Sequence, residues 1–408
     1  MHNFLLALWG NPLKWENANY SINDKMYNSI TSSSIIFKGE NVENSCIFIP
    51  DSVFPEMLYN NAFLNDINDN IKCKLIELFN EKDSGSADFI KLSKINLFPS
   101  PGTYYNNKEA YEYNVNIDYL YTYFYSAVIR LLSTDDDVDT ILIDTTHGVN
   151  FLQFIFIDSI KYACNTYSLN HKRKIVIKYY NSDPYYKNNA VLNINNIKIE
   201  VIDSKNILSI ISRDFLNKYK YYKNTIKKYF NNKNGLERYI KACSIMVQSD
   251  TIPYLLYIID NKHECLKIDN NYYVNISIKE ENCRKILCHE FSDNIKINIE
   301  TIAFMDSLNA IYNAMKSHIK YEIKDIYAIA DIFFGRDSDI IFIKKELSDR
   351  NKIKLHNTDL SNFKRNFKAH AGLLDYMYDI NNNFIEFKTA NINGIKINME
   401  YVINKIIE

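Results

Sequence analysis

The sequence predicts an α/β domain built on a parallel sheet, followed by a mostly α-helical domain that carries a small β-containing insertion. In the first half of the chain, short apolar runs alternate with longer helical patterns, which is typical of a parallel sheet covered by helices. After Asp203, apolar residues instead recur at the spacing of amphipathic helices. A chain of 408 residues is also long enough for two domains. We therefore expect domains at residues 1–203 and 204–408.

The first domain is predicted to contain five strands that are buried on both faces of the sheet. These runs are Phe4–Leu8, Cys46–Ile49, Lys94–Leu97, Thr140–Ile143 and Lys174–Tyr180. Helical patterns lie between them at Glu56–Glu81, Glu109–Ser133 and Val149–Tyr167. Two further runs, Ala190–Ile194 and Ile197–Ile202, flank Asn195-Asn196 and are predicted to form a hairpin that closes the domain.

The second domain is predicted to be helical except in one segment. Helices are expected at Asn206–Asn231 and from Gly235 onward. The helical period is lost over about residues 265–299, where Tyr272–Ile278 alternates in polarity, so this segment is expected to be a β-containing insertion. Further helices are predicted at Ile299–Phe334, Asp337–Ser348 and Asp359–Tyr378. A hairpin of Phe384–Thr389 and Gly394–Met399 should precede a short terminal helix.

The composition excludes several classes of protein. Hydrophobic residues make up 47% of the chain and aromatic residues 14%, which argues against intrinsic disorder. With 48 basic and 49 acidic side chains, the chain lacks the positive surface of a general duplex-DNA-binding protein. No apolar run reaches the roughly 18 residues of a membrane span. The odd number of scattered cysteines, seven, is typical of a reduced cytoplasmic protein. We expect a cytoplasmic protein that binds neither membranes nor duplex DNA.

Polar residues follow three of the predicted strands. Asp144-Thr145-Thr146-His147-Gly148-Val149-Asn150 joins a strand to a helix, and the strings Gly10-Asn11-Pro12 and Asn181-Ser182-Asp183-Pro184 follow two other strands. Ligands of parallel sheets bind beyond the carboxyl ends of strands, where helix N-termini offer free amide groups. Taken singly, each string could be a helix cap or an ordinary turn. Together they predict a ligand site at one edge of the sheet.

The ligand is expected to be nucleotide-like, but neither a nicotinamide cofactor nor a nucleoside triphosphate, because the glycine-rich fingerprint and the phosphate-loop lysine are absent from the sequence. The string Asp-Thr-Thr-His-Gly-Val-Asn resembles the hallmark of CARF domains, the Rossmann-like sensors of type III CRISPR systems. That family binds cyclic oligoadenylates at a two-fold dimer interface. The resemblance implies a homodimer and, as activator, the four-adenylate ring. It also implies a binding site formed by Gly10, Asn11, Pro12, Thr145, Thr146, His147, Gly148, Val149, Asn150, Asn181 and Asp183.

A second motif lies in the C-terminal domain, at Arg365-Asn366-Phe367-Lys368-Ala369-His370-Ala371-Gly372. Asn366 and His370 stand four residues apart and share a helix face, and Arg365 can reach toward them. Histidine transfers protons near neutral pH, and arginine stabilises the charge that develops on a reacting phosphate. Asparagine can orient the histidine ring or the scissile phosphate. The alternative is that His370 continues an apolar stripe as a core histidine while Arg365 is solvated.

The longer string resembles the Arg-x4-to-6-His motif of HEPN ribonucleases, in the form found in CARF–HEPN proteins. The resemblance implies that Arg365, Asn366 and His370 are catalytic and that two such sets meet across a dimer axis. The expected reaction is metal-independent attack of a ribose 2′-hydroxyl on the adjacent phosphate of single-stranded RNA. No cofactor is expected, and the cyclic oligoadenylate acts as an allosteric activator.

Other interpretations carry less weight. His263, Cys265, Cys283, Cys288 and His289 fit no standard zinc-ligand spacing, so no metal site is predicted. The lysine-rich run Lys218–Lys233 is expected to be a solvated helix face. One rival hypothesis is a non-catalytic, ligand-responsive regulator. Another is a nuclease that degrades the cyclic ligand in the sensor pocket around Thr145, Thr146 and Asn181.

Overall fold

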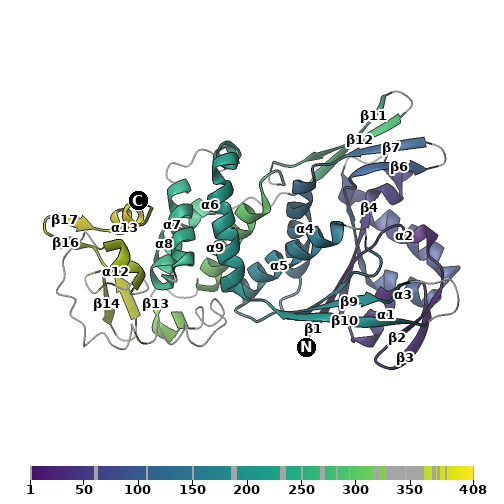
Figure 1. Ribbon diagram of the computed structural model, residues 1–408, viewed down its shortest axis with the longest axis horizontal. Coiled ribbons are helices and arrows are strands. Elements are labelled where there is room, and N and C mark those ends of the chain that lie inside the picture. The colour runs from purple at the N-terminus through teal and green to yellow at the C-terminus, as the bar shows by residue number, and fades with distance from the viewer. Residues whose placement is uncertain are drawn as a thin grey trace. The chain divides into compact units, whose positions relative to one another are not determined.

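Tertiary contacts divide the chain into two units, each assembled from segments that are distant in sequence (Figure 1). This computed structural model describes residues 2–58, 63–106, 109–148, 151–184, 191–229, 236–249, 251–266, 272–281, 284–293, 295–315, 321–324, 326–327, 345, 363–369, 374, 377–381 and 384–407. Unit 1 comprises Met1–Ala163, Ile175–Ile202 and Asn270–Ile299. Unit 2 comprises Cys164–Lys174, Asp203–Asp269 and Glu300–Glu408.

Unit 1 is organised around an eight-stranded sheet with the order β3-β2-β10-β9-β8-β1-β4-β5. Five neighbouring strands are parallel: β1 (His2–Leu8), β4 (Asn44–Pro50), β5 (Lys94–Phe98), β8 (Val138–Asp144) and β9 (Val176–Ser182). They are the five strands predicted from the sequence. In β1, the consecutive residues Leu5, Leu6 and Ala7 are all buried, as expected for a strand with both faces covered.

Helices cover both faces of this sheet (Figure 1). They are α1 (Ser32–Gly39), α2 (Asn68–Asn80), α3 (Ser84–Leu92), α4 (Ile117–Leu132) and α5 (Leu152–His171), with short 3-10 turns η1 (Pro12–Lys14), η2 (Asp51–Val53), η3 (Pro55–Met57) and η4 (Leu64–Ile67). Phe124 of α4 and Phe156 of α5 pack against Phe48 of β4. Trp9 packs instead against Phe89 of α3. The sheet with helices on both faces confirms the α/β prediction for this part of the chain.

Two of the predicted helices begin later than their sequence patterns suggested. The segment Glu56–Glu81 contains η3 and η4 before α2 starts. The segment Glu109–Ser133 begins with a strand, β7 (Glu109–Asn114), before α4. Tyr111 and Tyr113 are both buried while their neighbours are more exposed, so the true period in that strand is two residues. The hairpin of β2 (Ala18–Ile22) with β3 (Lys25–Ser29) was not predicted.

The predicted hairpin at residues 190–202 is wrong, because β10 (Val191–Val201) is one continuous strand. Its first residues pair with β2 in parallel, and its later residues pair with β9 in antiparallel fashion. Asn195 and Asn196 are both paired with β9, and the register shifts directly after them, between Asn196 and Lys198, so this point is a β-bulge and not a turn. Pairing with two different neighbours keeps the chain extended at this point.

The β-containing insertion belongs to unit 1, which corrects its assignment to the helical domain. Strands β11 (Val274–Glu281) and β12 (Arg284–Phe291) form an antiparallel hairpin. Strand β12 also pairs in parallel with β7, and β7 pairs with β6 (Gly102–Asn106), which gives a second sheet in the order β11-β12-β7-β6. A lone hairpin leaves both edges unpaired, and pairing with β7 satisfies one of them.

Unit 2 is mainly helical in its described part. Its helices are α6 (Ser204–Tyr229), α7 (Leu236–Gln248), α8 (Ile252–Leu266), α9 (Ile299–Met315), α12 (Phe363–Ala369) and α13 (Met399–Ile407). The predicted C-terminal hairpin is wrong. Strand β15 (Phe384–Phe387) pairs with β14 (Tyr378–Asn381) and β13 (Tyr321–Glu322), whereas β16 (Ala390–Ile392) pairs with β17 (Ile395–Ile397). Among the described residues, no helix is both long enough and apolar enough to span a membrane.

Candidate functional site

The three polar strings that follow β1, β8 and β9 lie side by side at one edge of the sheet. The Gly10 amide donates to the His147 carbonyl at 2.8 Å, which joins the end of β1 to the end of β8. The Thr145 amide donates to the Tyr180 carbonyl at 3.0 Å, and the Ser182 amide donates to Thr146 Oγ1 at 3.1 Å. These bonds join the end of β8 to the end of β9. We call this region the carboxyl edge.

Asp144 organises the carboxyl edge from inside. Its carboxylate is buried and accepts hydrogen bonds from Ser32 Oγ at 2.7 Å, from Ser33 Oγ at 2.5 Å and from the Thr146 amide at 2.9 Å. Ser32 and Ser33 begin α1, where the positive end of the helix dipole also stabilises a carboxylate. The Trp9 indole N–H donates to Ser33 Oγ at 3.0 Å. Asp144 therefore fixes the start of α1 against the end of β8.

The two threonines of the motif differ in how their hydroxyl groups are used. Thr145 is buried, and its hydroxyl donates to the Tyr180 carbonyl at 2.9 Å. Its role in the structure is to hold β8 against β9. Thr146 remains partly exposed, and its hydroxyl oxygen accepts the Ser182 amide. Of the two, Thr146 is better placed to meet a ligand.

Gly148 is closely packed against the side chain of Gln153. A Cβ atom at this position would lie 2.3 Å from Nε2 and 2.7 Å from Cγ of Gln153. The Gln153 amide group donates to the Thr145 carbonyl at 2.6 Å, so the side chain cannot move away without losing that bond. The next two predicted ligand residues, Val149 and Asn150, lie outside the described residues.

His147 lies in an aromatic and polar environment. Its ring stacks on Trp15, with centroids 4.1 Å apart and planes at 29°, and its Nε2 accepts the Ser32 amide at 3.3 Å. Burial lowers the pKa of the imidazole, although the negative charge of Asp144 acts in the opposite direction. Sequence analysis missed both Trp15 and Ser32. An aromatic residue three positions after Pro12 was the available signal, but nothing local linked it to a histidine far along the chain.

The strings after β1 and β9 are also ordered by their own hydrogen bonds. Asn11 is exposed and caps η1 by accepting the Leu13 amide at 3.1 Å, while Pro12 is buried as the first residue of that turn. Asn181 is partly exposed and pairs with Asn195 across the ladder. Asp183 accepts the backbone amide of Asn193 at 3.0 Å and the side-chain amide groups of Asn193 and Asn195. These bonds lower the pKa of the Asp183 carboxyl, which is already engaged within the chain.

His289, one of the residues considered as zinc ligands, makes a buried polar contact. His289 Nε2 lies 2.6 Å from Asp51 Oδ2, and both side chains are fully buried. The Ser100 amide donates to the other carboxylate oxygen at 2.9 Å. Cys288 is the neighbour of His289 on a strand, so its side chain points to the opposite face. The side chains of His263, Cys265 and Cys283 lie outside the described part. Within that part, no three such side chains gather in a metal-binding arrangement.

The predicted catalytic string is described only in part. Helix α12 is anchored by Phe363 and Phe367, which are buried and contact Tyr401 and Tyr254 respectively. Arg365 lies on this helix and is exposed. Asn366 is within α12, although its side chain is not described, and His370 lies outside the described residues. The structure thus places Arg365 at the surface of an anchored helix, and the grouping of the three residues stays a prediction.

Comparison with known proteins finds a family whose model matches a large part of unit 1. Residues 4–184 match the family described as "CRISPR system endoribonuclease Csx1, CARF domain". This range contains all three polar strings. A protein of Methanocaldococcus jannaschii named CRISPR system endoribonuclease Csx1 is 25% identical over 428 residues, which cover 91% of this chain and 85% of that protein. The N-terminal part of the chain is therefore similar to the CARF domain of this family, and the chain is similar over most of its length to a CRISPR system endoribonuclease.

Proposed function

We propose that the chain is an endoribonuclease of antiviral defence that cleaves single-stranded RNA. Cleavage is activated when a cyclic oligoadenylate binds the carboxyl edge, and the expected activator is the four-adenylate ring. The observation that carries this proposal is the extent of the similarity. The relative named an endoribonuclease aligns with 91% of the chain, well beyond the CARF domain. The similarity therefore also includes the C-terminal half of the chain, which carries the predicted catalytic residues.

The carboxyl edge has the chemistry that a cyclic nucleotide needs. Asn11, Thr146, His147 and Asn181 are all neutral hydrogen-bonding side chains in or near the exposed part of the edge. The buried carboxylate of Asp144 has its oxygens occupied by two hydroxyl groups and an amide. A phosphodiester ring would therefore meet donors without meeting an unpaired negative charge.

Cleavage is proposed to use Arg365, Asn366 and His370 from two copies of the chain. A histidine removes the proton of the ribose 2′-hydroxyl, whose oxygen forms a bond to the adjacent phosphorus as the bond to the 5′-oxygen breaks. A second histidine supplies a proton to the departing 5′-oxygen. Paired arginines stabilise the charge on the phosphate, and the products are a cyclic phosphate and a 5′-hydroxyl end. DNA lacks the attacking hydroxyl and should survive.

The test is cleavage of a labelled single-stranded RNA with and without cyclic tri-, tetra- and hexa-adenylate, in excess EDTA. We expect activation by the tetra-adenylate, and loss of cleavage in His370→Ala and Arg365→Ala with ligand affinity unchanged. Arg365→Lys should restore little, because a point charge cannot replace the guanidinium fork. The matched control is Lys368→Ala, which alters an exposed cation on the same helix.

Three outcomes would contradict the proposal. Wild-type turnover in His370→Ala would remove the catalytic assignment. Loss of cleavage in EDTA that magnesium restores would remove the histidine mechanism. Consumption of the cyclic ligand with no RNA cleavage would indicate a nuclease that acts on the ligand instead.

A further inference from the structure

Two groups that are distant in sequence from His147 contact its imidazole. Trp15, just after η1, stacks on the ring at a centroid distance of 4.1 Å. Ser32, the first residue of α1, directs its backbone N–H to Nε2 at 3.3 Å. Trp15 is itself held edge-on by the fully buried Trp9, with centroids 5.1 Å apart and planes at 68°. The orientation of the imidazole ring is thus fixed from two sides.

The Ser32 contact determines where the imidazole carries its proton. A backbone N–H can only donate, so Nε2 must offer a lone pair and the proton of the neutral ring must lie on Nδ1. An imidazolium would place a hydrogen on Nε2 facing the Ser32 N–H. Amides in the first turn of a helix lack a partner within the helix, so this donor remains available in every folded molecule. Nδ1 makes no hydrogen bond to any residue that the structure describes.

Trp15 also favours the neutral form of the His147 imidazole. A ring that is covered by an indole loses water on that face, and burial disfavours the charged form of histidine. The pKa of His147 is lowered by burial, against the opposing effect of Asp144, which is the charged group that acts on it in the described part of the chain. The covering indole and the Ser32 donor both oppose protonation.

We propose that Trp15 is a positioning residue that, with the Ser32 amide, holds His147 as a neutral imidazole whose Nδ1–H donates a hydrogen bond to an acceptor atom of the nucleotide ligand. The ligand part of this inference depends on the proposed function. The protonation state and the role of Trp15 do not, because they follow from the unliganded protein.

The first experiment uses the ligand-free protein. In ¹⁵N-histidine NMR spectra of the full chain, the His147 signal is assigned by its absence in His147→Asn. We expect the Nδ1–H tautomer, with no titration near the ordinary histidine pKa of about 6.5. In Trp15→Ala the titration should move toward that value, and Trp15→Phe should restore the wild-type behaviour. A proton on Nε2, or an ordinary titration in the wild-type protein, would overturn the inference.

The second experiment measures binding of cyclic tetra-adenylate by titration calorimetry. Asparagine places an N–H near the position of Nδ1 and glutamine near that of Nε2, so His147→Asn should keep most of the affinity and His147→Gln should lose about tenfold. Trp15→Ala should weaken binding more at pH 6 than at pH 8, whereas wild-type affinity should be similar at both. Equal weakening at both pH values would reduce Trp15 to a simple packing contact. If cyclic tetra-adenylate did not bind the wild-type protein, the proposed function would be overturned. The NMR experiment would still decide whether Trp15 positions His147.

Discussion

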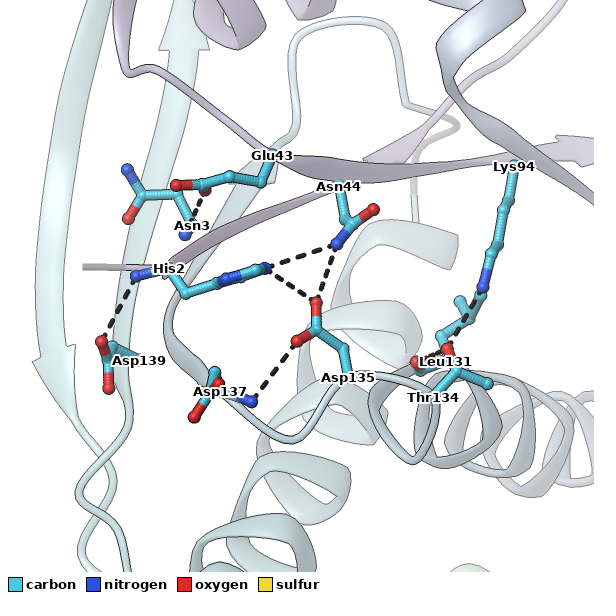
Figure 2. Close-up of polar contacts among 10 residues, drawn as sticks. All are labelled: His2, Asn3, Glu43, Asn44, Lys94, Leu131, Thr134, Asp135, Asp137 and Asp139. Atoms are coloured by element: carbon cyan, nitrogen blue, oxygen red, sulfur yellow. Dashed lines mark hydrogen bonds and ion pairs between the residues drawn. The ribbon is translucent and has the colours of Figure 1, made fainter.

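The two edges of the large sheet in unit 1 are built from the same strands but carry different kinds of polar cluster. At the carboxyl edge, Asp144 is buried and bonded to the first residues of α1. At the opposite edge, where β1 and β4 begin, Asp135 lies nearer the surface between His2 and Asn44 (Figure 2). His2 Nε2 and Asn44 Nδ2 each lie 2.8 Å from the same oxygen of Asp135. We call this second region the amino edge.

The difference follows from what meets each edge of a parallel sheet. Chains that leave the carboxyl edge enter helix N-termini, which have free N–H groups, whereas helices that return to the amino edge end in free carbonyl groups. Accordingly, Thr134 after α4 donates its hydroxyl to the Leu131 carbonyl at 2.8 Å (Figure 2). Further carboxylates line the amino edge in Figure 2, namely Glu43, Asp137 and Asp139. Four carboxylates thus lie together at the amino edge, and for this reason we expect a phosphate ligand at the carboxyl edge.

The largest expected effect of breaking this arrangement comes from Asp144→Ala. The variant leaves two buried hydroxyl groups and the Thr146 amide without their acceptor, which should lower the free energy of unfolding by about 3 kcal/mol. Both tryptophans of the chain, Trp9 and Trp15, lie at this edge, so urea unfolding can be followed by their fluorescence. A loss below about 1 kcal/mol would mean that Asp144 is not the anchor of the edge.

Gly148→Ala should affect ligand sensing more than stability. The added Cβ must displace Gln153, which disturbs the loop where the ligand is expected. The concentration of cyclic tetra-adenylate for half-maximal RNA cleavage should rise about tenfold, equivalent to about 1.4 kcal/mol. Gly39→Ala is the matched control at the far end of α1. Adding Gln153→Ala to Gly148→Ala should recover part of the loss, and an additive double variant would exclude the proposed clash.

His147 should make the stability of unit 1 depend on pH. Because its folded-state pKa is lowered, the unfolded chain binds a proton near pH 6.5 that the folded chain does not bind. Well above pH 6.5 neither state binds this proton, so His147 does not change the free energy of unfolding there. The free energy of unfolding should fall as the pH drops below that value. Replacing His147 with asparagine should flatten the decline between pH 7 and pH 5.5, as measured by urea unfolding. An unchanged slope would show that other groups dominate in this range.

The smallest expected effect belongs to the amino edge. Asp135→Ala removes a partly exposed pair with His2, and such pairs contribute less than about 1 kcal/mol. The free energy of unfolding should change by that amount at most, and less at high salt, with no change in the ligand concentration for half-activation. A loss of unfolding free energy as large as that of Asp144→Ala would show that the greater exposure of Asp135 does not make its contacts weaker than those of Asp144.

The sequence by itself determined the strand core and the location of the polar strings. Buried parallel strands are continuous apolar runs, so each of the five could be recognised within a few residues. Because parallel strands share an edge, the strings at Gly10, Thr145 and Asn181 could also be expected to meet. The resemblance to CARF domains depended on the same local string, which the match over residues 4–184 then supported.

Only the tertiary structure decided which distant segments pair. The segment Tyr272–Ile278 alternates in polarity as a strand does, but the pairing of β12 with β7 depends on a free strand edge far away in sequence. The contact of His289 with Asp51 spans 238 residues, and that of Ser32 with His147 spans 115. The period of the apolar residues indicates which face of a helix or strand is buried, but it does not indicate which other helix or strand packs against that face. Long-range pairing depends on the packing of whole elements, and for that reason Trp15 and Ser32 became visible only in the folded chain.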